Sequence, residues 1–393
     1  MNSFTYWSPT EVVFGKDTEC QVAKYIKKYG GSRVFIVYGG GSVVRSGLLK
    51  RVTDTLDEAG LAYAEFGGVQ PNPSLEHAKE GIARAIEFGA DFILGIGGGS
   101  AIDTAKGIAH GTANPDVDIW EYWTGEQCVE KSLPVGVILT ISAAGSETSS
   151  SSVLTNKATG SKRGLDTRYN RPKFAIMNPE LTYTLPAYQV ACGVTDIMMH
   201  TMDRYFNPLE NELTDAIAEA LLRTVITNGT VAVRDSHNYE AMSEIMWAGS
   251  LSHNGLTGLG GTGDFAPHQL GHELSGMFDI AHGASLAIVW GHWAHYIYKT
   301  KQSRFVRYAK NVWNITEGTD EEIALAGIQA TVDYFKSIGM PTCFSEAEEI
   351  GIRSDDVLKE LAYRCTFEGT RTIGGFQVLD GDAIYEIYKM TNV

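Results

Sequence analysis

The chain has 393 residues, a length that predicts two or three domains, each with a sizeable buried core. Asp and Glu number 47 against 32 Lys and Arg, and the resulting net charge of −15 argues against binding to nucleic acid or to an anionic membrane surface. With 44% hydrophobic and 20% charged residues, the composition excludes a globally disordered chain.

The five cysteines include no Cys-x-x-Cys pair, which favours reduced thiols over a disulfide framework or a zinc ribbon. The first residues lack the basic and apolar regions of a signal peptide. No stretch approaches the roughly 18 apolar residues that span a bilayer. We therefore expect a cytoplasmic protein with no membrane partner.

The first 185 residues alternate between short β-branched runs and segments with helical spacing. Such alternation predicts a parallel sheet with helices on both faces, the Rossmann-like arrangement that binds dinucleotides. Residues 151–185 are expected to form a short hairpin region interrupted by prolines. The expected strands are 33–38, 61–66, 92–96 and 135–139, and the expected helices are 48–59, 74–89 and 101–110.

After Pro186 the strand-like runs nearly vanish. The pattern predicts an α/β dinucleotide-binding domain over 1–185 and an all-helical, metal-binding domain over 186–393, packed with a cleft between them. The expected helices of the second domain are 187–206, 211–234, 239–256, 265–278, 283–298, 302–313, 320–338 and 354–366.

Two glycine clusters each follow an expected strand and precede a helix: Gly39-Gly40-Gly41-Ser42 and Gly97-Gly98-Gly99-Ser100. Glycine lets the backbone approach a phosphate, and a helix N-terminus offers free N–H groups. The strand before Gly39 ends without the acidic residue that would bind the ribose hydroxyls of NAD. With Arg45 one turn further on, this favours NADP(H) over NAD(H).

Histidines and one aspartate recur at the spacing of a helical turn in the second half of the chain. Asp196 and His200 are four residues apart, as are His268 and His272, and His282 follows. Ligands one turn apart share a helix face, and imidazoles with a carboxylate suit Zn²⁺ or Fe²⁺ better than Mg²⁺ or Ca²⁺. The spacing does not choose between the two metals.

At this point the motifs are recognisable. The chain resembles the iron-containing (group III) alcohol dehydrogenase family over essentially its whole length, and within it the NADPH-dependent butanol dehydrogenase and aldehyde reductase branch. That family has a dehydroquinate synthase-like architecture. The segments that carry the resemblance are 97–106, 145–147, 178–180, 184–186, 193–196 with His200, and 268–287.

The resemblance implies roles for individual residues. It places the metal on Asp196, His200, His268 and His282, and it places His272 beside the nicotinamide and substrate as the candidate proton relay. It extends the cofactor site beyond the two glycine clusters to residues elsewhere in the first domain: Asn72, Asp103, Thr140, Ser149 and Lys162.

Two positions depart from the family pattern. Ala144 stands where a hydroxyl residue usually precedes Gly-Ser-Glu, so a hydrogen bond to the cofactor is absent or comes from Ser142. Asp203 stands where relatives often have Glu, and we interpret it as a structural residue or one that supports a ligand.

The implied reaction is hydride transfer between NADP(H) and a small aldehyde or primary alcohol. A polyol dehydrogenase and a dehydroquinate synthase-like lyase are the alternatives within this fold. The segments 187–206 and 264–290 contain one cation, Arg204, which favours a neutral substrate, as do their apolar residues Phe206, Phe265, Leu274, Met277, Phe278 and Trp290. We expect a homodimer, with residues 5–7 and 12–14 as an N-terminal hairpin that pairs between subunits.

Overall fold

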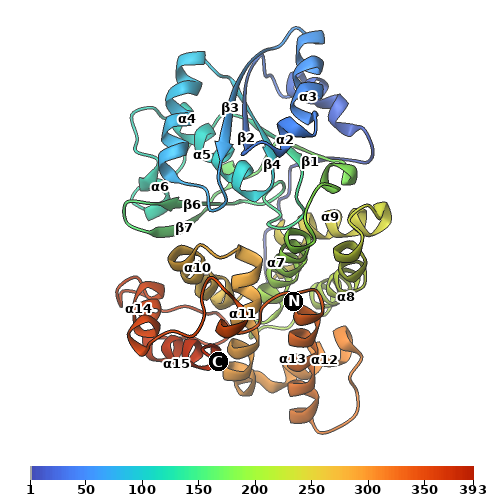
Figure 1. The fold of residues 1–393 in the computed structure, drawn as a ribbon, viewed down its shortest axis with the longest axis vertical. Coiled ribbons are helices and arrows are strands. Elements are labelled where there is room, and N and C mark those ends of the chain that lie inside the picture. The colour runs from blue at the N-terminus through green and yellow to red at the C-terminus, as the bar shows by residue number, and fades with distance from the viewer. Residues whose placement is uncertain (1) are drawn as a thin grey trace. The chain divides into compact units, whose positions relative to one another are not determined.

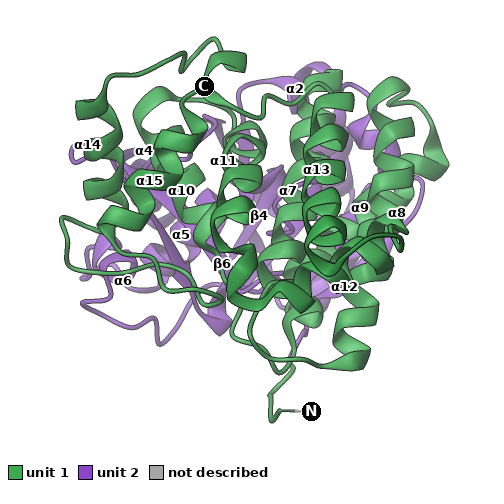
Figure 2. Cartoon of the chain, turned by 90° about the horizontal axis from the view of Figure 1, so that it is seen from below, with its two compact units in different colours: residues 1–6, 185–393 green, residues 7–184 purple. Residues whose placement is uncertain are grey.

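The computed structural model describes residues 2–393, which form two compact units (Figures 1 and 2). The α/β unit comprises Trp7–Thr184. The helical unit comprises Leu185–Val393 together with the start of the chain up to Tyr6. The sequence placed that start in the first domain.

A six-stranded sheet in the order β1-β8-β5-β4-β2-β3 forms the centre of the α/β unit. Every neighbouring pair is parallel. Its central strands are apolar and fully buried, as expected of a sheet covered on both faces. The strands are β1 (Glu11–Phe14), β2 (Arg33–Gly39), β3 (Ala62–Val69), β4 (Phe92–Gly97), β5 (Val135–Leu139) and β8 (Phe174–Met177).

Helices flank this sheet on both faces. The core cluster that joins β2, β4 and β8 to α1 and α3 includes Ile36, Leu94, Ile176, Val52 and Ile26. On α4, a Cβ on Gly81 would clash with side chains of Phe66 and Ile108, so α4 packs tightly against β3 and α5. The helices are α1 (Val22–Lys28), α2 (Ser42–Arg45), α3 (Leu48–Glu58), α4 (Leu75–Phe88), α5 (Gly99–Ala113) and α6 (Trp120–Thr124), with single 3-10 turns at Thr18–Gln21, Arg168–Asn170 and Pro179–Thr182.

The predicted hairpin region contains an antiparallel pair, β6 (Ser151–Asn156) and β7 (Ser161–Asp166), followed by the sheet strand β8. β8 was missed because its four residues lie between Pro172 and Pro179, which read as strand breakers. The expected N-terminal hairpin does not form within the chain, and its pairing between subunits stays a prediction. Residues 5–7 form no strand, and β1 pairs in parallel with β8, so that Val13 lies beside Ile176.

The second unit is helical, as predicted. One helix, α15, was not predicted, although Ile384, Ile387 and Tyr388 give it a buried face and Asp380 caps its start. The helices are α7 (Ala187–Tyr205), α8 (Glu212–Arg234), α9 (Tyr239–His253), α10 (Ala266–Phe278), α11 (His282–Ile297), α12 (Gln302–Trp313), α13 (Asp320–Ser337), α14 (Asp355–Cys365) and α15 (Gly381–Thr391), with 3-10 turns at Leu256–Gly258, Tyr298–Lys301 and Phe344–Glu346.

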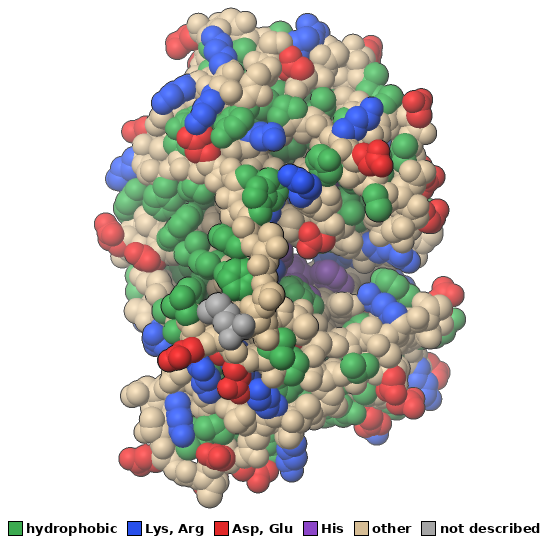
Figure 3. Space-filling view, turned by 180° about the vertical axis from the view of Figure 1, so that it is seen from behind, with side chains coloured by type: hydrophobic (Ala, Val, Ile, Leu, Met, Phe, Trp, Pro, Cys, Tyr) green, Lys and Arg blue, Asp and Glu red, His purple; other side chains and the backbone are tan. Residues whose placement is uncertain are grey.

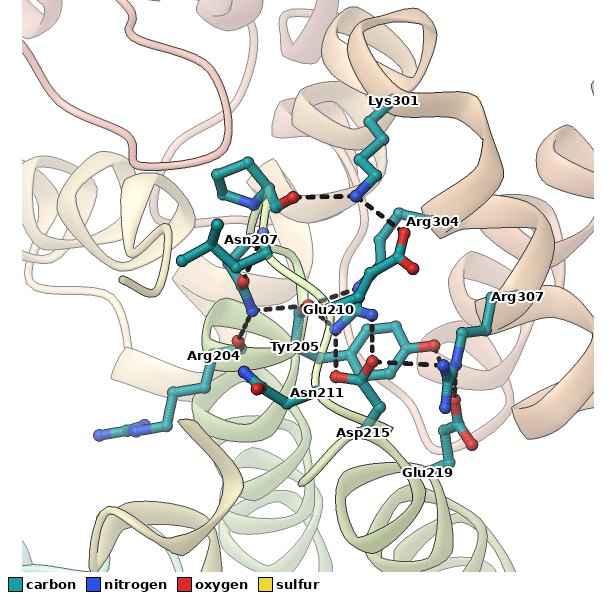
Figure 4. Close-up of polar contacts among 12 residues, drawn as sticks. Arg204, Tyr205, Asn207, Glu210, Asn211, Asp215, Glu219, Lys301, Arg304 and Arg307 are labelled. Atoms are coloured by element: carbon teal, nitrogen blue, oxygen red, sulfur yellow. Dashed lines mark hydrogen bonds and ion pairs between the residues drawn. The ribbon is translucent and has the colours of Figure 1, made fainter. Parts of the chain in front are cut away.

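A buried ionic network fixes the C-terminal end of α7 (Figure 4). Tyr205 is the last residue of α7, and its carbonyl accepts a hydrogen bond from Arg304 Nε at 2.8 Å. The Arg304 guanidinium also donates to both carboxylate oxygens of Asp215. Arg307 pairs with Glu219, which also accepts from the Tyr205 hydroxyl. The network ties α7, α8 and α12 together at one point.

Among the described residues, α8 alone is long and apolar enough to cross a membrane, with a mean hydropathy of 1.2 over 18 residues, which corrects the expectation that no stretch approaches such a length. However, α8 carries the buried carboxylates of Asp215 and Glu219, and both are paired with arginines of α12. These buried ion pairs anchor α8 to α12 within the helical unit.

Candidate functional site

Two of the predicted metal ligands lie one turn apart on α7. Asp196 Oδ1 is 3.6 Å from His200 Nδ1, and both side chains are buried. The spacing of four residues places them on one face of the helix.

Two further histidines approach the same carboxylate from other helices. His268 lies in the first turn of α10 and His282 is the first residue of α11. The Nε2 atom of each is 3.6 Å from Asp196 Oδ1. Asp196, His268 and His282 together form a cluster that can hold a metal ion.

This cluster fits a divalent cation. Asp196 Oδ1, His200 Nδ1 and His268 Nε2 are buried without a hydrogen-bond partner among the described residues. Buried polar atoms left in this state are costly, and a metal ion satisfies them together. Ligand atoms at about 2.0–2.2 Å from a tetrahedral ion are about 3.3–3.6 Å apart, which agrees with the observed spacing.

The electrostatics of the two buried histidines differ. Burial, reinforced by neighbouring histidines, lowers the pKa of His200 well below its usual value, so its ring is neutral, as a metal ligand must be. For His268, burial acts against the charged ring, but the carboxylates of Asp203 and Asp196 raise its pKa to about 9. Metal binding at His268 therefore competes with a proton.

Two other histidines lie next to the predicted ligands. His272 lies one turn beyond His268, with its ring centre 5.3 Å from that of His282 and 6.2 Å from that of His268. The ring of His253, at the end of α9, packs nearly perpendicular to the ring of His200, and the two ring centres are 4.0 Å apart. His253 was not predicted, because it stands alone on its helix and no spacing relates it to the predicted metal ligands.

The two glycine clusters lie at the carboxyl ends of parallel strands. Gly39 ends β2 and Gly97 ends β4, and α5 begins at Gly99 with Gly98 as its N-cap. Gly97 has φ +154°, and a Cβ there would stand 2.7 Å from Ala101 Cβ. The positive φ and the close approach of Ala101 both restrict this position to glycine. The backbone without a side chain therefore lies at the start of α5, which is the geometry of a phosphate-binding turn.

Three further predicted cofactor residues, Asn72, Asp103 and Lys162, make hydrogen bonds within the α/β unit. Lys162 donates to Asn72 Oδ1 at 3.0 Å, which joins two residues 90 positions apart. Asp103 is buried, and its carboxylate accepts from Ser146 Oγ and from the Val153 backbone. The contacts of these residues with a cofactor stay predictions.

The segment after β5 lies against the second glycine cluster. Thr140 N donates to the Gly97 carbonyl at 3.0 Å, and a Cβ on Gly99 would stand 2.9 Å from Ala144 Cβ. Ser142 is buried, and its hydroxyl has no hydrogen-bond partner among residues 2–393. Ser149, in contrast, bonds the Ser151 backbone. The contacts of Ser142 and Ser149 with a cofactor stay predictions.

One buried lysine in this region was missed. Lys106 Nζ donates to the Ser146 carbonyl, the Ser146 hydroxyl and the Ser151 carbonyl, each at 2.7 Å. These bonds hold the 146–151 loop against α5. The sequence showed Lys106 only as part of a motif, with nothing to indicate its partners 40 and 45 residues away.

Comparison with known proteins agrees with this arrangement. The family model for iron-containing alcohol dehydrogenase matches residues 9–179, and the C-terminal model of the same family matches residues 190–391. The chain belongs to the iron-containing alcohol dehydrogenase family. It is an oxidoreductase of that family, and its Asp196, His268 and His282 form a cluster that can hold a metal ion.

Individual relatives cover nearly the whole chain. NADH-dependent butanol dehydrogenase A of Clostridium acetobutylicum is 42% identical over 99% of both chains. NADPH-dependent aldehyde reductase YqhD of Escherichia coli is 38% identical over 92% of this chain and 93% of its own. The crystal structure of NADH-dependent butanol dehydrogenase A from Thermotoga maritima superimposes with a TM-score of 0.96 at 33% identity, covering 100% of this chain and 99% of that one.

Part of the interpretation of the apolar residues needs correction. Phe206, Leu274 and Trp290 are fully buried in the core of the helical unit, where Phe206 stacks on Phe305 at 4.5 Å. They do not bear on the substrate of this family member. Phe265 is different, because its ring centre lies 5.8 Å from that of His268.

Acidic and basic side chains are interspersed on the face shown in Figure 3, with no broad basic patch on that face. This agrees with the net charge of −15 and with a small-molecule substrate.

Proposed function

We propose that this protein is a metal-dependent alcohol dehydrogenase and aldehyde reductase that transfers hydride between NADP(H) and a small aldehyde or primary alcohol, with butanal and butanol as representative substrates. The observation that carries the proposal is the set of three imidazole nitrogens, each 3.6 Å from Asp196 Oδ1. The names of relatives at 42% and 38% identity support the substrate class.

The preference for NADP(H) is supported by the turn after β2. This turn carries Gly39, Gly40 and Gly41 and no acidic side chain, and Arg45 NH1 lies 3.0 Å from where a Cβ on Gly41 would stand. A guanidinium at this turn can pair with a 2′-phosphate, whereas a ribose hydroxyl would favour an acid there. Because the named relatives include NADH- and NADPH-dependent enzymes, the proposal rests on these residues of this chain.

The chain's own residues have defined parts in the proposed reaction. When bound, the divalent metal, Fe²⁺ or Zn²⁺, supplies Lewis-acid polarisation of the substrate oxygen, and the reduced nicotinamide supplies the hydride. Asp196, His200, His268 and His282 would hold the metal. The backbone from Gly97 to Ser100 would bind the cofactor pyrophosphate at the start of α5.

His272 has the proposed role of moving the proton. It is partly exposed on α10, one turn from His268, so it can exchange protons with solvent. It would deliver a proton to the product oxygen during aldehyde reduction and accept one in the reverse direction.

The alternatives are a polyol dehydrogenase and a dehydroquinate synthase-like lyase. A highly anionic substrate needs several cations, but near the four ligand residues the segments 187–206 and 264–290 offer only Arg204. Arg204 donates to the His200 carbonyl at 2.8 Å, and its guanidinium lies 4.9 Å from the Phe265 ring centre. These contacts favour a neutral substrate.

The test is nicotinamide consumption by metal-replete protein, with NADPH and NADH in parallel and with butanal as substrate. We expect NADPH to be consumed faster than NADH. Glycerol with NADP⁺ or NAD⁺ is the control for a polyol enzyme and should react slowly. Faster turnover of glycerol, or no reaction with butanal despite bound metal, would show that the proposed substrate class is wrong.

We further propose a cytoplasmic homodimer. All five cysteines are free, which is typical of a reducing compartment. Within the α/β unit, Trp7 and Phe14 are exposed and β1 is an edge strand, so this unit offers an apolar surface for a second copy. Light scattering after size-exclusion chromatography would give the mass of two chains for the wild type and of one chain for a Trp7→Glu variant.

A further inference from the structure

We infer that Asp203 is a positioning residue of the metal centre, which holds His268 by Nδ1 so that Nε2 is directed to the metal. This inference rests on the proposed function, because it assigns a role within the same site. It concerns a residue that binds neither the metal nor the substrate in that proposal.

The contact is short and buried. His268 Nδ1 lies 2.5 Å from Asp203 Oδ2, and the side chains of the two residues are 8% and 0% exposed. The opposite ring nitrogen, Nε2, is the atom that faces Asp196 Oδ1 at 3.6 Å. One ring therefore bridges a supporting carboxylate and the ligand carboxylate.

One face of α7 builds most of the site. Asp196, His200 and Asp203 occupy positions i, i+4 and i+7, which lie along the same side of a helix. The first two are ligands, and the third fixes a ligand that comes from α10. Consequently, the position of α7 sets the positions of three ligands.

The backbone near Asp203 is anchored to the start of α10. Asp264 N donates to the Asp203 carbonyl at 2.6 Å, and Asp264 Oδ1 accepts from Ala266 N in the first turn of α10. Two residues beyond Asp203, the Tyr205 carbonyl accepts from Arg304 (Figure 4). Asp203 is thus held on both sides, and it can orient His268 with little freedom of its own.

The chemistry explains why such a residue would matter. A neutral imidazole carries its proton on either nitrogen, and the hydrogen bond made by one nitrogen decides which nitrogen is left to bind a metal. A carboxylate on Nδ1 keeps the proton there, orients the ring and raises the basicity of Nε2.

A purely structural role fits the contacts less well. Asp203 Oδ1 is buried with no hydrogen-bond partner in the described chain, 2–393. A buried carboxylate with an orphaned oxygen is unfavourable for folding alone. Its presence next to a ligand histidine is accounted for by the orientation of that histidine.

The experiment measures Zn²⁺ affinity by competition with a fluorescent chelator, for metal-free wild-type protein and three variants. Asp203→Asn removes the charge at nearly constant shape, and Asp203→Glu keeps the carboxylate. Glu219→Gln is the matched control, because Glu219 is a buried carboxylate of the same unit that pairs with Arg307 and Tyr205. Thermal unfolding of each metal-free variant shows that it is folded.

We expect Asp203→Asn to weaken Zn²⁺ binding by about 10- to 100-fold. We expect Asp203→Glu to recover most of the affinity, and Glu219→Gln to lose stability but to bind Zn²⁺ as the wild type does. If Asp203→Asn lowers the stability but binds Zn²⁺ like the wild type, the residue is structural and the inference is wrong. If the wild type itself binds no Zn²⁺ or Fe²⁺, the proposed function fails as well, and the two failures are thereby distinguished.

Discussion

His110 provides a prediction about stability that does not depend on the metal. It lies on α5, the helix that begins at the second glycine cluster, and it is fully buried. One ring nitrogen contacts Ser132 Oγ at 2.9 Å and the other contacts Asn170 Oδ1 at 2.8 Å. Burial lowers the pKa of His110 to about 4, so the ring is neutral in the folded protein at neutral pH.

The magnitude follows from the difference between the folded and unfolded chains. In the unfolded chain the pKa of this histidine is about 6.5, whereas in the folded chain it is about 4. Stability therefore falls as the pH decreases between these values. The full difference corresponds to about 3 kcal/mol, of which about 2 kcal/mol of the free energy of unfolding is lost between about pH 7 and about pH 5.

The assay is urea unfolding at these two pH values for the wild type and His110→Gln. Although this variant is less stable at pH 7, it should lose about 2 kcal/mol less than the wild type on acidification. His237→Gln, at an exposed position of the helical unit, is the control and should behave as the wild type does. If the wild type and His110→Gln lose equal stability, His110 is not held neutral by burial and the reasoning is refuted.

Three further predictions concern single contacts. Asp215→Ala leaves the Arg304 guanidinium buried without its carboxylate and should cost about 3–5 kcal/mol of stability, measured by chemical unfolding; a loss below 1 kcal/mol would contradict this. Gly99→Ala places a Cβ 2.9 Å from Ala144 Cβ and should weaken cofactor binding with Zn²⁺ affinity unchanged, measured by titration calorimetry; an unchanged cofactor Kd would show that the turn does not bind it. Arg45→Ala should raise the Kd of NADPH about tenfold and leave that of NADH unchanged, and equal effects on both would argue against a 2′-phosphate contact.

Local pattern was sufficient to predict much of the fold. Buried parallel strands such as Val34–Val37 are recognisable because both faces are covered, and helix periodicity located α7 to α14 within a few residues. Strand β8 was missed because a four-residue strand between prolines has no periodicity to detect. The order of the strands in the sheet was not predicted, since pairing depends on contacts between distant segments.

In the candidate site too, local spacing was predictable, whereas contacts between distant residues were not. The i, i+4 spacing put Asp196 and His200 on one face and also singled out His268, His272 and His282, and the resemblance assigned metal ligation to His268 and His282 but not to His272. The contact between Asp203 and His268 joins residues 65 positions apart, and no local pattern encodes it. The same holds for Lys106 and the 146–151 loop, whose bonds appear only once α5 and the hairpin are folded together.

Metal dependence is best measured by titrating metal-free protein with Fe²⁺ under anaerobic conditions, or with Zn²⁺, while recording NADPH consumption with butanal. We predict that the rate rises with added metal and reaches a plateau at one metal per chain, and that His282→Ala stays inactive over the same range. Full turnover by metal-free wild-type protein in the presence of a chelator, or by His282→Ala, would contradict a reaction at the Asp196 metal centre.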